Sequence, residues 1–179
     1  MQETKRSILQ LGNPLLRQVA RPIENPQDLA LQELVEELLQ SMEQANGVGI
    51  AAPQMGISKQ LVIIASRPTP RYPDAPEMPP TPMLNPRLVD HSDEMEKGWE
   101  GCLSVPGIRG LVPRYTSVTV DYLDCHGQSQ QKILHDFVAR IFQHEYDHLQ
   151  GIVFVDRVES TRELMSEQEY QRQIIGSTL

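Results

Sequence analysis

The chain has 179 residues, of which 39% are hydrophobic and 22% are charged, and its formal net charge at pH 7 is -8. This length and composition are ordinary for one globular domain with a real hydrophobic core, so we expect residues 1–179 to form a single domain. The excess of acidic groups gives nucleic-acid binding no electrostatic support. No apolar run approaches the roughly 18 residues of a membrane span, so we expect neither nucleic acid nor membrane as a partner.

The N-terminus and the cysteines indicate where the protein works. The opening MQETKRSILQLG lacks the apolar core and the small-residue cleavage site of a signal peptide. Cys102 and Cys125 are the only cysteines, which is typical of a reducing compartment and not of a disulfide framework. We therefore expect a cytoplasmic protein.

The first third of the chain predicts one helix and one strand. Prolines punctuate residues 13–26, so an irregular segment is expected there. Between 28 and 45 apolar residues recur at helical spacing, and Gly47 suits the end of that helix. Residues 47–56 are expected to form a glycine-rich loop, and the β-branched run 60–66 predicts a buried strand.

The rest of the chain predicts a proline-rich loop, several strands and two helices. The stretch 67–82 carries seven prolines, so it is expected to be a surface loop without regular structure. Strands are expected near 83–89, 99–104, 117–123 and 129–134, the last two joined by a hairpin turn at 124–128. A helix is expected from an N-cap at Asp136 to Gly151, and a C-terminal helix over 161–175. This order predicts an α+β fold, with mixed or antiparallel sheets packed around a central helix.

The helix expected after Asp136 carries the sequence HEYDH at residues 144–148. His144 and His148 continue an apolar stripe formed by Phe137 and Ile141, and residues four apart on a helix can bind one ion together. Glu145 projects beside such an ion, where it could move a proton. The pattern H-E-x-x-H therefore predicts a metallohydrolase. The motif supplies two of the metal ligands, so a third must come from another part of the chain.

Several residues compete for the place of the third ligand. Phe154 occupies the position at which one protease group has a third histidine, so that group is excluded. Downstream carboxylates are available, as in a second protease group, but they lie in a mostly polar terminal segment: Glu163, Glu167 and Glu169. Upstream, a thiolate at Cys102 would complete a Cys-His-His site, with Cys125 as a competitor in a predicted turn. The other histidines are expected at the surface: His91, His126 and His135.

Three segments in this order resemble the peptide deformylase family: GVGIAAPQ at 47–54, EGCLS at 100–104 and HEYDH at 144–148. The opening ILQLGNPLLRQVARPI at 8–23 is also similar to the usual start of that family. The resemblance implies a hydrolase that removes the formyl group from the N-terminal formyl-methionine of new polypeptides and releases formate.

The resemblance also implies a role for individual residues. Cys102, His144 and His148 would bind a divalent metal, with water as the fourth ligand, and Glu145 would act on that water as general base and then as general acid. The side chain of Gln54 and the N–H of Leu103 would stabilise the oxyanion. The residues implied in peptide binding are Val48, Gly49, Ile50, Gly101 and Arg109. Glu100 and Asp147 are candidates for orienting a histidine ligand or for holding a nearby loop. Arg140 stands where some members place an apolar residue of the methionine pocket. It would reshape that pocket, or its stem would line the wall while its head reaches solvent.

The implied metal is Fe²⁺ in the cell, with Ni²⁺ or Co²⁺ as active substitutes in purified protein and Zn²⁺ as the ion that suits the ligand types. The implied partners are N-formylmethionyl nascent chains, together with a transient contact with the ribosome. The C-terminal segment is not strongly basic, which disfavours ribosome docking through that segment.

Overall fold

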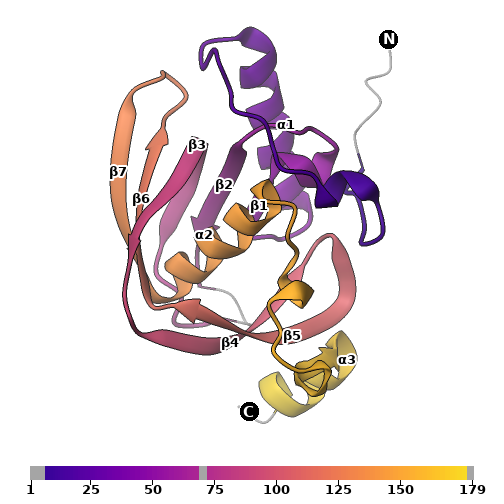
Figure 1. The fold of residues 1–179 in the computed structure, drawn as a ribbon. Helices are drawn as coiled ribbons and strands as arrows, with labels where there is room; N and C mark the ends of the chain where they lie inside the picture. Colours follow the sequence, from indigo (N-terminus) through magenta and orange to yellow (C-terminus); the bar gives the residue numbers. More distant parts are fainter. Residues whose placement is uncertain (1–6, 69–71, 177–179) are drawn as a thin grey trace.

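The computed structural model describes residues 7–68 and 72–176 of the chain (Figure 1). Within them the fold is α+β, and all pairs of named strands are antiparallel. Residues 1–6, 69–71 and 177–179 lie outside the described part, and with them part of the opening segment and of the proline-rich stretch 67–82.

Two sheets and a small number of helices make up the fold. The larger sheet has the strand order β1-β2-β3-β6-β7, with β1 Gly49–Ala51, β2 Leu61–Ser66, β3 Met78–His91, β6 Ser117–Leu123 and β7 Ser129–His135. The smaller sheet has the order β4-β5-β8, with β4 Met95–Cys102, β5 Val105–Tyr115 and β8 Leu164–Ser166. The α-helices are α1 Leu29–Gln44, α2 Asp136–Leu149 and α3 Glu167–Tyr170. Shorter helical turns are Pro14–Arg17, Ala52–Met55, Phe154–Asp156, Thr161–Glu163 and the π-helical Gln171–Ile175.

The larger sheet separates two hydrophobic cores. Val62 and Ile64 of β2 pack in the cluster that includes α2, whereas Leu61 and Ile63 pack in the cluster that includes α1. Because successive side chains of a strand point to opposite faces, a strand covered on both faces is apolar throughout. This explains why the run at 60–66 lacks alternation and still forms a strand.

Helix α2 contacts strands of both sheets (Figure 1). It packs on β1, β2, β6 and β7 of the larger sheet and on β5 of the smaller one. Beyond its end, Gly151 has a φ of 73°, and a Cβ there would lie 2.6 Å from the carbonyl oxygen of Arg17. Only glycine suits that position, so the N-terminal segment can pack closely against the end of the motif helix.

Most of the predicted elements are confirmed. The helix expected at 28–45 is α1, whose N-cap Asp28 accepts a hydrogen bond from the N–H of Ala30. The strands expected at 60–66, 83–89, 117–123 and 129–134 correspond to β2, β3, β6 and β7. The helix expected after Asp136 is α2, although its N-cap is His135 and Asp136 is its first residue.

Three predictions need correction, and one strand was not predicted. The loop expected at 67–82 ends earlier, because β3 begins at Met78. The glycine-rich loop at 47–56 contains β1 and a 3₁₀ turn. Strand β5 was missed because Pro106, Gly107, Gly110 and Pro113 interrupt it; it pairs with β8 only at Ile108–Gly110, and partly unpaired strands tolerate proline. The continuous helix expected over 161–175 is wrong: a 3₁₀ turn, β8, α3 and a π-helical turn follow one another there.

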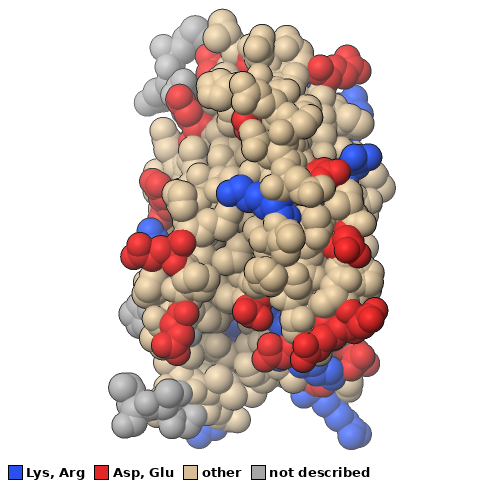
Figure 2. Space-filling model, turned by 90° about the vertical axis from the view of Figure 1, so that its left-hand side faces the viewer, with Lys and Arg blue, Asp and Glu red and all other residues tan. Residues whose placement is uncertain are grey.

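None of the described helices has the length and apolar character needed to cross a bilayer. Figure 2 shows one face of the molecule, on which acidic side chains gather mainly towards the lower edge and the flanks. This distribution agrees with the net charge of -8.

Candidate metal centre and its cavity

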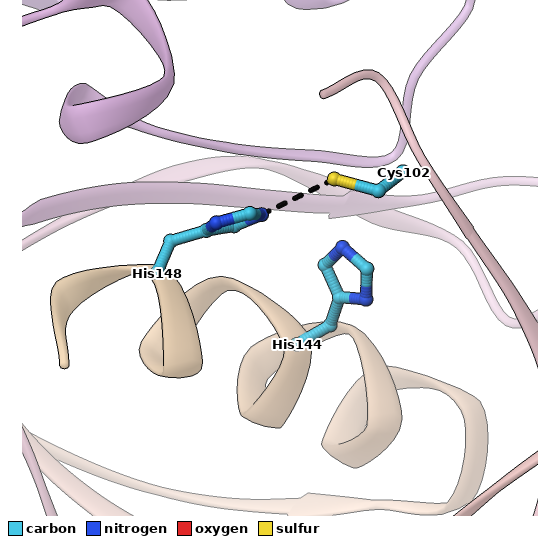
Figure 3. Close-up of side chains that lie close together, drawn as sticks. All are labelled: Cys102, His144 and His148. Atoms are coloured by element: carbon cyan, nitrogen blue, oxygen red, sulfur yellow. Dashed lines mark hydrogen bonds between the residues drawn. The ribbon is translucent and has the colours of Figure 1, made fainter. Parts of the chain in front are cut away.

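Cys102, His144 and His148 lie together although the thiol and the histidines come from different elements. Cys102 is the last residue of β4, and both histidines stand on α2. One ligand atom from each residue lies within 4.8 Å of the others, and the sulfur of Cys102 is 3.3 Å from Nε2 of His148. Figure 3 shows both imidazoles rising from the same side of α2 toward the sulfur.

These three side chains fit a divalent metal. A thiolate and two imidazoles are ligands that transition metals prefer, and three protein ligands leave one position for water. Burial alone would raise the pKa of the Cys102 thiol, but His148 and His144 outweigh it and hold that pKa well below its usual value. Nδ1 of His148 is buried without a hydrogen-bond partner in the described structure. A buried, charged cluster of this composition is costly unless a cation completes it.

Glu100 orients one of the histidines. Its Oε2 lies 2.8 Å from Nδ1 of His144, which leaves Nε2 as the nitrogen free to face the cluster. Burial alone would raise the pKa of Glu100, but the guanidinium of Arg114 outweighs it and, with His144, holds the pKa far below the usual range. The carboxylate is therefore charged and able to accept a hydrogen bond from the imidazole N–H.

Glu145 is a buried carboxylate with an unused oxygen. Its Oε2 has no hydrogen-bond partner in the described structure, and burial raises its pKa to about 7. A carboxyl group with a pKa near neutrality can both take up and give back a proton under working conditions. Gly49 lies beside it, and a Cβ at that position would overlap with the carboxylate. The glycine therefore gives Glu145 its space.

Gln54 presents its amide nitrogen to the cluster. Its Oε1 accepts a hydrogen bond of 2.8 Å from the N–H of Ala51, and its Nε2 donates to Ser104 Oγ at 3.2 Å and lies 3.5 Å from the sulfur of Cys102. The bond from Ala51 fixes which end of the amide points inward. Gln54 is thus a preorganised donor rather than a simple turn residue.

Cys102, His144 and Glu145 line one cavity of about 920 Å³, together with Gln54 and Glu100, whereas His148 is buried behind it. Its walls include most of the residues to which the resemblance gives a role: Val48, Gly49, Gln54, Gly101, Cys102, Leu103, Arg109, His144 and Glu145. Ile50 does not line the cavity; it is fully buried in β1, next to Gly49, which does.

The competing ligand candidates lie outside the cluster of Cys102, His144 and His148, although Glu167 lines the same cavity. Glu163 bonds Lys97, Glu167 bonds Arg109, and Glu169 bonds Arg172. In the part of the chain that the structure describes, the cluster contains neither these carboxylates nor Cys125. The other histidines are exposed, as expected: His91, His126 and His135.

An arginine network beneath the site was not predicted. Arg114 bonds both Glu100 and Asp147, and Arg157 also bonds Asp147. Arg140 lines the cavity wall, as one of the two expectations had it. The expectation for its head needs correction: the head is mostly withdrawn from solvent and bonds Glu100 and three carbonyl groups of β4 and β5, those of Glu96, Gly98 and Val112. A Cβ at Gly98 would lie 2.7 Å from the guanidinium carbon of Arg140. No local signal reveals these bonds, because they join positions far apart in the chain.

The antiparallel α+β fold and the Cys-His-His cavity with its buried glutamate define a hydrolase with a candidate metal centre. Comparison with known proteins identifies its family. The family model "Polypeptide deformylase" matches residues 5–163. The chain therefore belongs to the polypeptide deformylase family, metal-dependent enzymes that remove the N-formyl group of nascent chains.

Individual relatives agree with this assignment. The chain is 57% identical to Peptide deformylase 2 of Nostoc sp. over 96% of both chains. A Met-Ala-Ser-bound class I type b peptide deformylase from Acinetobacter baumannii is similar with a TM-score of 0.83 and 46% identity, covering 85% of this chain and 97% of that one. A Synechococcus elongatus peptide deformylase in complex with actinonin is similar with a TM-score of 0.80 and 37% identity, covering 91% of this chain and 84% of that one.

Proposed function

We propose that this chain deformylates N-formylmethionyl peptides with Cys102, His144 and His148 as metal ligands and Glu145 as the group that moves the proton. The observation that carries the proposal is the cluster of Cys102, His144 and His148, beside a cavity that Glu145 and Gln54 also line. A divalent ion bound there supplies a Lewis acid and a water activated near neutral pH. The family resemblance favours Fe²⁺ in the cell, with Zn²⁺, Ni²⁺ or Co²⁺ in purified protein.

Glu145 takes the proton of the attacking water and delivers it to the leaving nitrogen. Its burial supports this role, because a pKa of about 7 lets one carboxyl group act first as base and then as acid. The glycine at position 49 keeps the carboxylate clear of the strand beside it. The bond that breaks is the formyl C–N bond, and the proton that Glu145 returns makes the new amino group.

Gln54 and the N–H of Leu103 stabilise the charge that builds on the formyl oxygen. The amide of Gln54 is already oriented by Ala51, so no reorganisation is needed when that charge develops. Loss of one such donor typically lowers the rate about 100- to 1000-fold.

The substrate lies as an extended chain between β1 and the end of β4. The backbone of Val48, Gly49 and Ile50 on one side and that of Gly101 on the other pair with it in the manner of an added strand. Arg109 lines the cavity on the same side as Gly101.

The wider setting follows from the same proposal. Residues 1–179 act as a single catalytic domain with α2 as its central element, supported by the contacts of α2 with both sheets. Nascent chains are made in the cytoplasm, so we place the enzyme there, with a transient contact at the ribosome. Both cysteines are free, which suits that compartment.

The test is formate release from formyl-Met-Ala-Ser by anaerobically prepared, iron-loaded protein, with Cys102→Ser measured alongside. Turnover that disappears in the variant, together with loss of bound metal, supports both the reaction and the third ligand. Absence of turnover in protein shown to hold metal refutes the proposal. Turnover and metal content that persist in Cys102→Ser refute the ligand set.

A further inference from the structure

The C-terminal segment Leu164–Ile175 is docked on the sheet that carries Cys102. Its strand β8 pairs with β5, with Met165 opposite Arg109. Tyr170 is 3% exposed and meets Trp99 edge-on, with ring centroids 5.7 Å apart. The match to the family model ends at residue 163, so this fixed segment lies outside the part that the family model describes.

This segment holds the side chain of Arg109. Nε of Arg109 donates to Oε2 of Glu167 at 2.5 Å, and the guanidinium carbon lies 5.3 Å from the centre of the Tyr170 ring. On the opposite side, a Cβ at Gly101 would overlap with the guanidinium. Glu167 and Tyr170 therefore keep Arg109 pressed over the backbone of Gly101, directly beside Cys102 in the chain.

The same segment also forms part of the cavity wall. Glu167, Gln171 and Ile175 line the cavity that contains Cys102 and Glu145. The formyl group must lie beside Cys102 and Glu145 in order to react. The cavity wall near Arg109 is therefore available to the part of the peptide that follows methionine.

We propose that the segment Leu164–Ile175 recognises the residues that follow methionine, with Glu167 positioning Arg109 and with Gln171 and Ile175 in contact with the peptide. The inference rests on the proposed deformylase function and extends it to the downstream part of the substrate. Glu167 also neutralises Arg109, so this wall suits a continuing polypeptide better than the free carboxylate of a short peptide.

The experiment compares two amidated substrates in the metal-loaded full chain: formyl-Met amide, which ends at methionine, and formyl-Met-Ala-Ser amide. Glu167→Ala removes the partner of Arg109, and Gln171→Ala removes a side chain that lines the cavity and donates to Oε1 of Glu167 at 2.8 Å. Glu169→Ala is the matched control, because this carboxylate is exposed and bonds Arg172 and Gln173. Thermal unfolding of each variant checks that the fold is retained.

We expect Glu167→Ala to raise KM for the longer peptide about fivefold more than KM for formyl-Met amide, as loss of a partly exposed charged hydrogen bond implies. Gln171→Ala should act in the same direction, kcat should change little, and Glu169→Ala should leave the ratio of the two KM values as it is. If Glu167→Ala raises both KM values by the same factor, or leaves KM for the longer peptide unchanged, the inference is refuted and the proposed function is not affected. Failure of the unmodified enzyme to release formate from either substrate overturns the proposed function and the inference with it.

Discussion

Replacement of Arg114 by methionine tests whether a buried charge network supports the metal centre. Nε and NH2 of Arg114 donate to Glu100 at 2.9 and 3.0 Å, and NH1 donates to Asp147 at 2.6 Å. The three side chains are only 5%, 4% and 6% exposed. Glu100 orients His144, and Asp147 directly precedes His148, so the network underlies both histidines.

The expected loss of stability follows from this burial. Removal of one partner from a buried ion pair costs about 3–5 kcal/mol, because a charge is left without compensation. Here each carboxylate keeps a second arginine: Arg140 at 3.1 Å from Glu100 and Arg157 at 2.7 Å from Asp147. We therefore expect the lower end of the range, a decrease of about 3 kcal/mol in the free energy of unfolding at pH 7.

The loss should also depend on pH. Burial alone would raise the pKa of Glu100, but Arg114 outweighs it and holds that pKa below the ordinary value of 4.5. A depressed carboxyl pKa stabilises the folded state above the unfolded-state pKa, and this stabilisation is lost as the pH falls. Without Arg114 much of that contribution is absent, so the difference between parent and variant should be largest at pH 7 and should shrink below about pH 4.5.

The assay is urea unfolding of the metal-free proteins at pH 7 and pH 4, followed by circular dichroism. Arg157→Met is the control, because it removes a bond to the same Asp147 from a side chain that is 46% exposed; its cost should stay within about 1 kcal/mol. A cost below about 1 kcal/mol for Arg114→Met at pH 7, or the same cost at both pH values, refutes the reasoning.

Three further changes test the site itself. Glu145→Gln should keep the metal but lower kcat about 100- to 10,000-fold; metal analysis and formate release check this, and turnover within tenfold of the parent would contradict the role of Glu145. Gly49→Ala places a Cβ 2.8 Å from Cγ of Glu145, so we expect kcat to fall with little change in melting temperature, and unchanged kcat would show that Glu145 has room to move. Arg140→Met removes a partner of Glu100 and should weaken metal retention about 10- to 100-fold, measured as metal loss to a chelator; retention equal to the parent, with an altered preference for the side chain at methionine, would instead assign Arg140 to the pocket.

Features that depend on local spacing can be predicted from the order of residues alone. Histidines four apart on an apolar stripe already specify a helix with both imidazoles on one side, and α2 carries them in that way. The β-branched run at 60–66 likewise specified a strand buried on both faces. Helical and strand periodicities act between near neighbours, so they can be read without knowledge of the fold.

The contacts between distant parts of the chain depend on how the elements pack. The bond from Gln54 to Cys102 spans 48 positions, and the bonds from Arg140 to Glu100 and from Arg114 to Asp147 span 40 and 33. The C-terminal segment was predicted as a helix with a solvated face, yet it pairs with β5 and holds Arg109. Such contacts depend on how whole elements pack against one another. Local sequence patterns do not predict that packing, because they report only on residues close together in the chain. The residues of the site could therefore be predicted from the sequence, whereas their hydrogen-bond partners follow from the packing of α2 against the β4–β5 hairpin.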